Sequence, residues 1–363
     1  MTTPARQAEA DRVEVVYHYA LAQLGFQAVE ESLELWHLSV PPTRSATAGT
    51  RWLDRAIRLI MRRRGRARDL ALSYYRLVRA LRTGATIGDP RRNESGFVSL
   101  EDLRDEFEAQ VDRIAPQPAQ EPSPDDSLTN PPDDSGESHS VDSPPSYEDA
   151  EYDEDDQILL EEIAELEAEA DRQDREAEEE LLEQLDKKGN QNLQRKLELI
   201  DEDQTATEVD AQRAEAHRKA GARQAAAAER ITMNAARGLT YSLGEYDGRV
   251  MGWARYHPPI GTPCGWCAML VSRGAIYKSR SSARLQGVDS DFDTYHDGCH
   301  CIAIPAFTKE QYDSSPLFDL NREYSRLWNE GDGDELPKKP TLSQWRKYMR
   351  QRQKQEAQTP AAA

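Results

Sequence analysis

Five residues in the C-terminal third of the chain have the types and spacing of metal ligands. Cys264 and Cys267 form a C-x-x-C pair, and His296, Cys299 and Cys301 follow as H-x-x-C-x-C. Two close ligand pairs far apart in a sequence suit a tetrahedral zinc ion, because each pair supplies one edge of the tetrahedron. We therefore predict a structural zinc site made by Cys264, Cys267, His296 and Cys299, with Cys301 as a substitute ligand.

Other interpretations of this cluster stay open. His300, between the last two cysteines, is a second substitute ligand, and the thiols could instead carry no metal or form a disulfide in an oxidising environment. A deaminase-type catalytic zinc would use Pro263-Cys264-x-x-Cys267, but it needs an upstream H-x-E, and neither His-x-Glu nor Cys-x-Glu occurs upstream. The sequence also identifies no orienting group or oxyanion hole for a Cys–His nucleophile. A structural site is favoured.

Short elements must bring the two halves of the cluster together. The segment 241–259 mixes turn glycines with Val250, Trp253 and Tyr256, which predicts one or two short strands. Residues 267–278 predict a short helix or strand, a turn at Gly274 and a further strand, whereas 279–295 fit no element. Apolar residues at helical spacing over 312–327 predict a helix that packs on this small domain.

Charge is distributed very unevenly along the chain. The net charge of −20 divides into +6 over residues 1–100, −27 over 101–190 and +1 over the remainder. The N-terminus lacks the layout of a signal peptide, and no apolar run approaches the roughly 20 residues that span a bilayer. We expect a soluble protein made in a cytoplasm, without membrane contact.

The N-terminal region is expected to be helical. Apolar residues fall at helical spacing over 11–38 and again over 51–81. A short acidic helix should follow Ser99, with Asp102 completing a capping box. Residues 115–156 are rich in Pro, Ser, Asp and Glu and have too few apolar side chains to fold, which predicts disorder.

The helices that follow are expected to be polar. Residues 156–200 have high helix propensity, but their apolar stripe lapses between Asp171 and Glu180, which predicts a solvated spacer helix. An alanine-rich helix over 210–237 should end at Gly238. The basic segment 342–355 predicts a last helix whose Trp345 and Tyr348 could dock on a partner.

Arginine is concentrated in the second predicted helix. Eleven arginines lie between Arg51 and Arg82, with only Asp54 and Asp69 as acidic residues. Guanidinium groups neutralise phosphates and release counterions, so this helix is a candidate nucleic-acid contact. The alternative is a solvated face that packs against an acidic partner, and the acidic segment 101–190 of this chain could shield it until assembly.

These patterns predict a mostly α protein with a helical N-terminal region, a long acidic linker that is partly disordered and partly helical, and a small α+β, zinc-knuckle-like C-terminal domain. We expect five divisions. A helical domain with the arginine-rich helix spans 1–112, an acidic disordered linker 113–156 and a charged spacer helix 157–204. A domain with the Cys/His cluster spans 205–335, and a basic C-terminal helix and tail span 336–363.

Three short runs carry a resemblance to a known family: 252–255 (GWAR), 264–279 (CGWCAMLVSRGAIYKS) and 295–301 (YHDGCHC). They resemble the MuF-like minor capsid, or head morphogenesis, proteins of tailed bacteriophages, in the form found in phages of actinobacteria. Residues 73–87 (SYYRLVRALRTGATI) are similar to the helical head of these proteins. The resemblance covers about 10–100 and 205–330 and skips the acidic middle.

The resemblance implies a virion protein inside the procapsid that associates with the portal and acts in head assembly, and in DNA packaging or ejection. The implied partners are the portal protein, the major capsid protein and packaged DNA, the last through Arg51–Arg82. The cysteine and histidine elements of the family match here, except that His300 stands where the family often has a small polar or basic residue. A capsid maturation protease, or another phage enzyme using the Cys/His cluster, is the alternative to a structural role.

Overall fold

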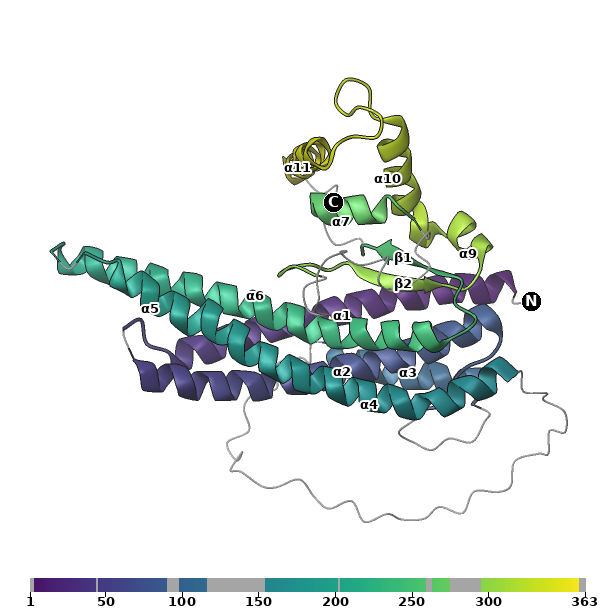
Figure 1. Ribbon diagram of the computed structural model, residues 1–363, viewed down its shortest axis with the longest axis horizontal. Helices are drawn as coiled ribbons and strands as arrows, with labels where there is room; N and C mark the ends of the chain where they lie inside the picture. Colours follow the sequence, from purple (N-terminus) through teal and green to yellow (C-terminus); the bar gives the residue numbers. More distant parts are fainter. Residues whose placement is uncertain are drawn as a thin grey trace, which may run out of the picture.

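A bundle of long helices forms most of the molecule. The computed structural model describes residues 3–43, 45–89, 98–115, 154–201, 203–258, 263–274 and 295–358. Four long helices run side by side, and a shorter one packs against the first two (Figure 1). These are α1 (Pro4–Ser39), α2 (Ala46–Thr83), α4 (Glu154–Leu185), α6 (Ala206–Tyr246) and the shorter α3 (Leu100–Ile114). The predicted mostly α fold is confirmed.

Helical periodicity placed the core of the first two helices correctly. The predicted apolar stripe of α1 is buried at Tyr17, Leu24 and Ala28, although Val16, also predicted to belong to it, is 41% exposed. Tyr17 stacks on Tyr74 of α2 with ring centroids 3.9 Å apart. At the other end of the bundle, Trp36 of α1 lies edge-on against Trp52 of α2. The capping box predicted at the start of α3 forms as well.

The helix expected to be a solvated spacer is part of the bundle. Ala177, Leu181 and Leu185 of α4 are fully buried, and α4 contacts both α2 and α6. A π-helical turn, η2 (Asp186–Asn190), joins α4 to α5 (Gln191–Glu198). The prediction of a spacer is wrong here because the apolar stripe resumes at spacings of four residues after its polar interruption.

The alanine-rich helix does not end at Gly238. α6 continues to Tyr246, so residues 241–246, the first part of the segment expected to form strands, are helical. A Cβ atom at Gly238 would lie 2.8 Å from Oε1 of Gln173, at the end of a flexible side chain of α4. The cost of about 1 kcal/mol for glycine inside a helix is offset by the burial of Tyr241 and Leu243 in the added turns.

A smaller layer lies along the bundle. The strand predicted near Trp253 is confirmed as β1 (Gly252–Tyr256), which pairs antiparallel with β2 (Ile302–Ala306), Gly252 lying opposite Ala306. Ile302 and Ile304 of β2 share one apolar core with α1, α2 and α6. β2 leads into α9 (Lys309–Ser314), which lies beside the end of the ribbon (Figure 1), and then into η3 (Pro316–Phe318). Above the ribbon lie α7 (Gly265–Val271), α10 (Asp319–Glu330) and α11 (Leu342–Gln358) (Figure 1).

The last helix packs within the chain. Trp345 of α11 is fully buried and lies edge-on against Tyr324 and Trp328 of α10. Tyr348 is buried too and donates a hydrogen bond to Asp332 at 2.5 Å. These two aromatic residues therefore stabilise the small C-terminal layer, which corrects the expectation that they are free to dock on a partner.

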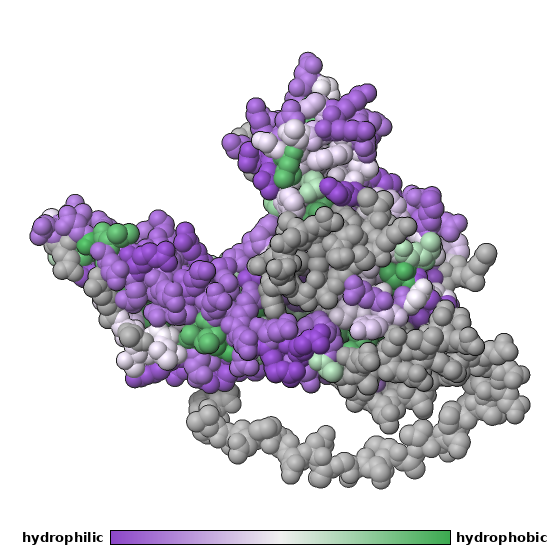
Figure 2. Space-filling model, viewed as in Figure 1, coloured by the Kyte–Doolittle hydropathy of each residue, from purple (hydrophilic) through white to green (hydrophobic). Residues whose placement is uncertain are grey.

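Several predictions fall on residues outside the described parts of the chain. These are the disordered linker, apart from its ends, the strand expected after Gly274, and most of 279–295. The helices that the structure describes include none that is both long and apolar enough to cross a bilayer. The visible face of the long helices is largely hydrophilic (Figure 2).

Candidate metal centre

The start of α7 positions the first two thiols. Cys264 is the N-cap of this helix, and its Sγ accepts a hydrogen bond from the backbone N–H of Cys267 at 3.4 Å. An N-cap side chain turns back toward the residue three positions later. The C-x-x-C spacing therefore brings both sulfur atoms to the same end of α7, with Cys267 buried and Cys264 half-exposed.

A tight turn and a strand position the second half of the cluster. The backbone N–H of Cys299 donates to the carbonyl of His296 at 3.1 Å, and Gly298, inside this turn, has φ +73°. Glycine adopts that left-handed conformation without steric cost, which explains its place in the sequence H-D-G-C. Because β2 begins directly after Cys301 and pairs with β1, the turn is held beside α7.

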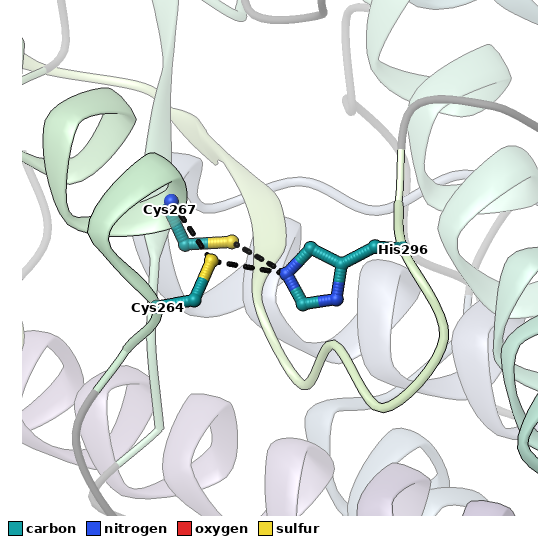
Figure 3. A group of neighbouring side chains, drawn as sticks. All are labelled: Cys264, Cys267 and His296. Atoms are coloured by element: carbon teal, nitrogen blue, oxygen red, sulfur yellow. Dashed lines mark hydrogen bonds between the residues drawn. The ribbon is translucent and has the colours of Figure 1, made fainter. Parts of the chain in front are cut away.

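The five predicted ligands come together in space, although α7 and the turn are about 30 residues apart in sequence. His296 Nε2 lies 3.0 Å from Cys264 Sγ and 3.8 Å from Cys267 Sγ (Figure 3). Cys267 Sγ is 3.5 Å from Cys299 Sγ. Cys267 is thus common to two groups of possible ligands, one with Cys264 and His296 and one with Cys299 and Cys301.

These separations fit a tetrahedral ion. Zinc–sulfur bonds of about 2.3 Å place the donor atoms of a tetrahedron roughly 3.8 Å apart. Each of the two donor groups could therefore hold a metal ion, and Cys267 belongs to both groups. That the ion binds, and which four donors it uses, stay predictions.

The orientation of His296 suits a ligand. Its Nδ1 lies 3.0 Å from the carbonyl oxygen of Asp297, and a carbonyl can only accept, so Nδ1 carries the proton of this hydrogen bond. In the neutral ring, Nε2 then presents its lone pair to the thiols. Metal-binding histidines are oriented in this way in many proteins.

The thiols perturb one another strongly. Cys267 and His296 lower the pKa of Cys264 to about 4, whereas the hydrogen bond with Cys264 raises the pKa of His296 to about 9. Cys267 and Cys301 lower the pKa of Cys299, while burial raises the pKa of Cys301. Closely spaced thiolates repel one another, and a bound cation relieves this repulsion.

His300 does not belong to either donor group. Its Nε2 lies 3.7 Å from Glu229 of α6, and its ring contacts Phe26 of α1. The prediction of His300 as a substitute ligand therefore loses its support, whereas Cys301 keeps it.

An ionic network that the sequence did not reveal anchors the turn. The Asp297 carboxylate accepts hydrogen bonds from Lys188 of η2 at 2.6 Å and from Arg230 of α6 at 2.9 Å. Arg230 also pairs with Glu180 of α4 at 2.8 Å. The four residues are spread over more than a hundred positions and form no motif, so only the acidic residue within H-D-G-C gave a local signal.

The arginine-rich helix α2 has two kinds of arginine. Six of the eleven form ion pairs with carboxylates outside α2, on α1, α3 or α4 or just after α6: Arg63, Arg64, Arg68, Arg76, Arg79 and Arg82. The other five are exposed and follow one another at spacings of three or four residues: Arg51, Arg55, Arg58, Arg62 and Arg66. Only this exposed stripe is available to a partner, so the predicted arginine face is about half as large as the sequence indicated.

Two comparisons with known proteins gave matches to this chain. A family profile described as VG15 protein matches residues 177–330, which is less than half of the chain. The Gene 15 protein of Mycobacterium phage L5 is 29% identical over 115 residues, covering 23% of this chain and 38% of that relative. The chain is similar to bacteriophage proteins. No solved structure matches it.

The matched region contains the whole candidate centre. It begins within α4, before Glu180, and ends with α10, so it includes both halves of the Cys/His cluster and the ionic network around Asp297. The arginine stripe of α2 lies outside it. The chain spans only 38% of the length of the phage L5 relative.

Proposed function

We propose that this chain is a minor capsid protein of the MuF-like type, located inside the phage head and associated with the portal. It acts in head assembly and in DNA packaging or ejection. The Cys/His cluster binds one zinc ion with a structural role. The observation that carries this proposal is the meeting of C-x-x-C and H-x-x-C-x-C within the part of the chain that is similar to phage proteins.

The surroundings of the cluster favour a structural metal site over a catalytic centre. Its two halves come from α7 and from the turn before β2, and the layer that contains them has a single two-stranded sheet among the described residues. A structural zinc ion contributes folding free energy of about 10–16 kcal/mol in small domains. The ion would hold α7, and with it α10 and α11, to the bundle.

The portal and the major capsid protein are the proposed protein partners, and packaged DNA is the proposed partner of the arginine stripe. Five exposed guanidinium groups along one side of α2 offer donors to successive phosphates. The remaining arginines support the bundle and are not part of this surface.

Co-purification with the portal tests the assembly role. The full chain is co-expressed with the portal protein and the major capsid protein of the same phage. We expect it to co-purify with the portal and to leave the major capsid protein intact. Specific cleavage of the capsid protein, abolished by replacing one cysteine or serine of this chain, would favour a maturation protease instead. Absence from purified procapsids would remove the assembly role.

Metal analysis tests the zinc site. We expect about one zinc ion per chain in the purified protein, and none in His296→Gln and Cys267→Ser. His300→Gln is the matched control, because His300 is adjacent in sequence but lies outside both donor groups. A wild-type chain without metal, or an equal decrease of zinc in the His296 and His300 variants, contradicts the site.

A further inference from the structure

Two buried arginines lie against the candidate metal centre, and neither forms an ion pair with a carboxylate among the described residues. Seven arginines are buried in the described part of the chain, and five of them form ion pairs with carboxylates: Arg64, Arg76, Arg79, Arg82 and Arg230. The other two are Arg237 and Arg255. Removing a guanidinium group from water without a counter-charge is costly, so these two require an explanation.

Arg255 faces the thiols. It lies on β1 and is only 1% exposed. It lines the same pocket as Cys267, His296 and Cys299. Its positive charge therefore lies beside the predicted metal ligands.

Arg237 approaches the same place from the bundle. It lies on α6, is 4% exposed and donates a hydrogen bond to the carbonyl oxygen of Cys299. The central guanidinium carbons of Arg237 and Arg255 lie 3.9 and 4.0 Å from the centre of the Tyr295 ring. The aromatic ring thus holds both cations beside the turn that carries His296 and Cys299.

The charge of a thiolate-bound metal explains this arrangement. A divalent ion with three thiolates and a neutral imidazole carries one net negative charge, and with four thiolates it carries two. We propose that Arg255, assisted by Arg237, neutralises the negative charge of a thiolate-bound divalent metal and thereby sets the affinity of the centre for its ion. This inference rests on the proposed zinc site and assigns to both arginines a positioning and electrostatic role outside the ligand set.

The inference predicts that the charge of Arg255 matters more than its shape. Arg255→Gln in the full chain should weaken zinc binding by about tenfold or more in competition with a chelator, as removal of groups around metal ligands does elsewhere. Arg255→Lys keeps the charge and should retain most of the affinity. The exposed Arg346, which lies over Trp266 of α7 at 5.6 Å, provides the control Arg346→Gln, which should not change zinc binding.

A second measurement does not use the metal. In the zinc-free protein, the rate of cysteine alkylation by iodoacetamide reports the thiolate content, and Arg255→Gln should lower it relative to Arg255→Lys. If Arg255→Gln does not fold, two other variants test the proposal. Arg237→Gln should bind zinc more weakly than wild type, and Arg255→Lys should bind it with nearly the affinity of wild type.

The outcomes separate this inference from the zinc site itself. A wild-type chain that binds no zinc overturns the site. A wild-type chain that binds zinc while Arg255→Gln binds it equally well overturns only the role of Arg255. Equal decreases of affinity in the Gln and Lys variants would show that Arg255 acts through packing, which also overturns the proposal.

Discussion

Arg79 of α2 and Asp247, directly after α6, form an ion pair of 2.6 Å in which both side chains are only 1% exposed. The Tyr75 hydroxyl donates to the same carboxylate at 2.9 Å. Asp247 Oδ1 also accepts the backbone N–H of Arg249. The pair thus fixes the point where the chain leaves the bundle and turns toward β1, which lies against the candidate metal centre.

Removal of this carboxylate should destabilise the fold strongly. Asp247→Ala leaves the Arg79 cation buried without its counter-charge, and breaking a buried pair in this way costs about 3–5 kcal/mol. Urea unfolding followed by circular dichroism measures the change. The exposed pair Arg58–Asp54 is the control, because Asp54→Ala should cost less than about 1 kcal/mol. Similar effects of the two variants would contradict a special role for the buried pair.

Two helical glycines should respond in opposite directions to alanine. A Cβ atom at Gly221 of α6 would lie 2.7 Å from the Trp36 ring, so Gly221→Ala should force the helices apart and cost about 1–3 kcal/mol. At Gly65 of α2 a Cβ atom meets nothing within 4 Å, so Gly65→Ala should stabilise the protein by about 0.5–1 kcal/mol. Thermal melts of the two variants compare them directly, and a stabilised Gly221→Ala protein would contradict the close approach of the helices.

Glu14 predicts a pH dependence of stability. Burial, only partly opposed by Arg82, raises the pKa of Glu14 from 4.5 to about 7. The unfolded chain loses this proton at a lower pH than the folded chain. The contribution of Glu14 is therefore full below pH 4.5 and is lost as the pH rises through 7.

Glu14→Gln removes this pH dependence. Relative to wild type, its unfolding free energy should increase by up to about 3 kcal/mol between pH 4.5 and pH 8. Denaturant unfolding at a series of pH values tests this. A difference between the two proteins that is constant across this range would mean that Glu14 titrates normally.

The exposed arginine stripe should decide DNA binding without affecting folding. Replacing Arg51, Arg55, Arg62 and Arg66 by Gln should weaken binding to duplex DNA and reduce the salt dependence of the affinity, by about 0.9 in log–log slope for each phosphate that the variant no longer neutralises. The melting temperature should hardly change, because no ion pair is formed by these four among the described residues. Unchanged DNA affinity would leave the stripe as a solvated face.

The sequence predicted the structure best where an element is determined by residues within that element. Helical spacing located α1 and α2, and the capping box at Ser99 marked the start of α3. It failed at Gly238, because the helix continues to Tyr246 and buries Tyr241 and Leu243 in its added turns. It also failed for α4, since a short polar interruption does not reveal which neighbour buries the residues on either side.

The sequence by itself determined which residues can serve as metal ligands, because the C-x-x-C and H-x-x-C-x-C spacings each place their ligand side chains close together within one turn of chain. Only the tertiary structure decided that the two halves meet, that His300 turns toward Glu229, and that Arg237 and Arg255 lie beside the thiols. The same holds for α2, where six arginines became internal partners of distant carboxylates and five stayed exposed. Ion pairs and metal sites join residues remote in sequence, so their formation depends on how helices and strands pack.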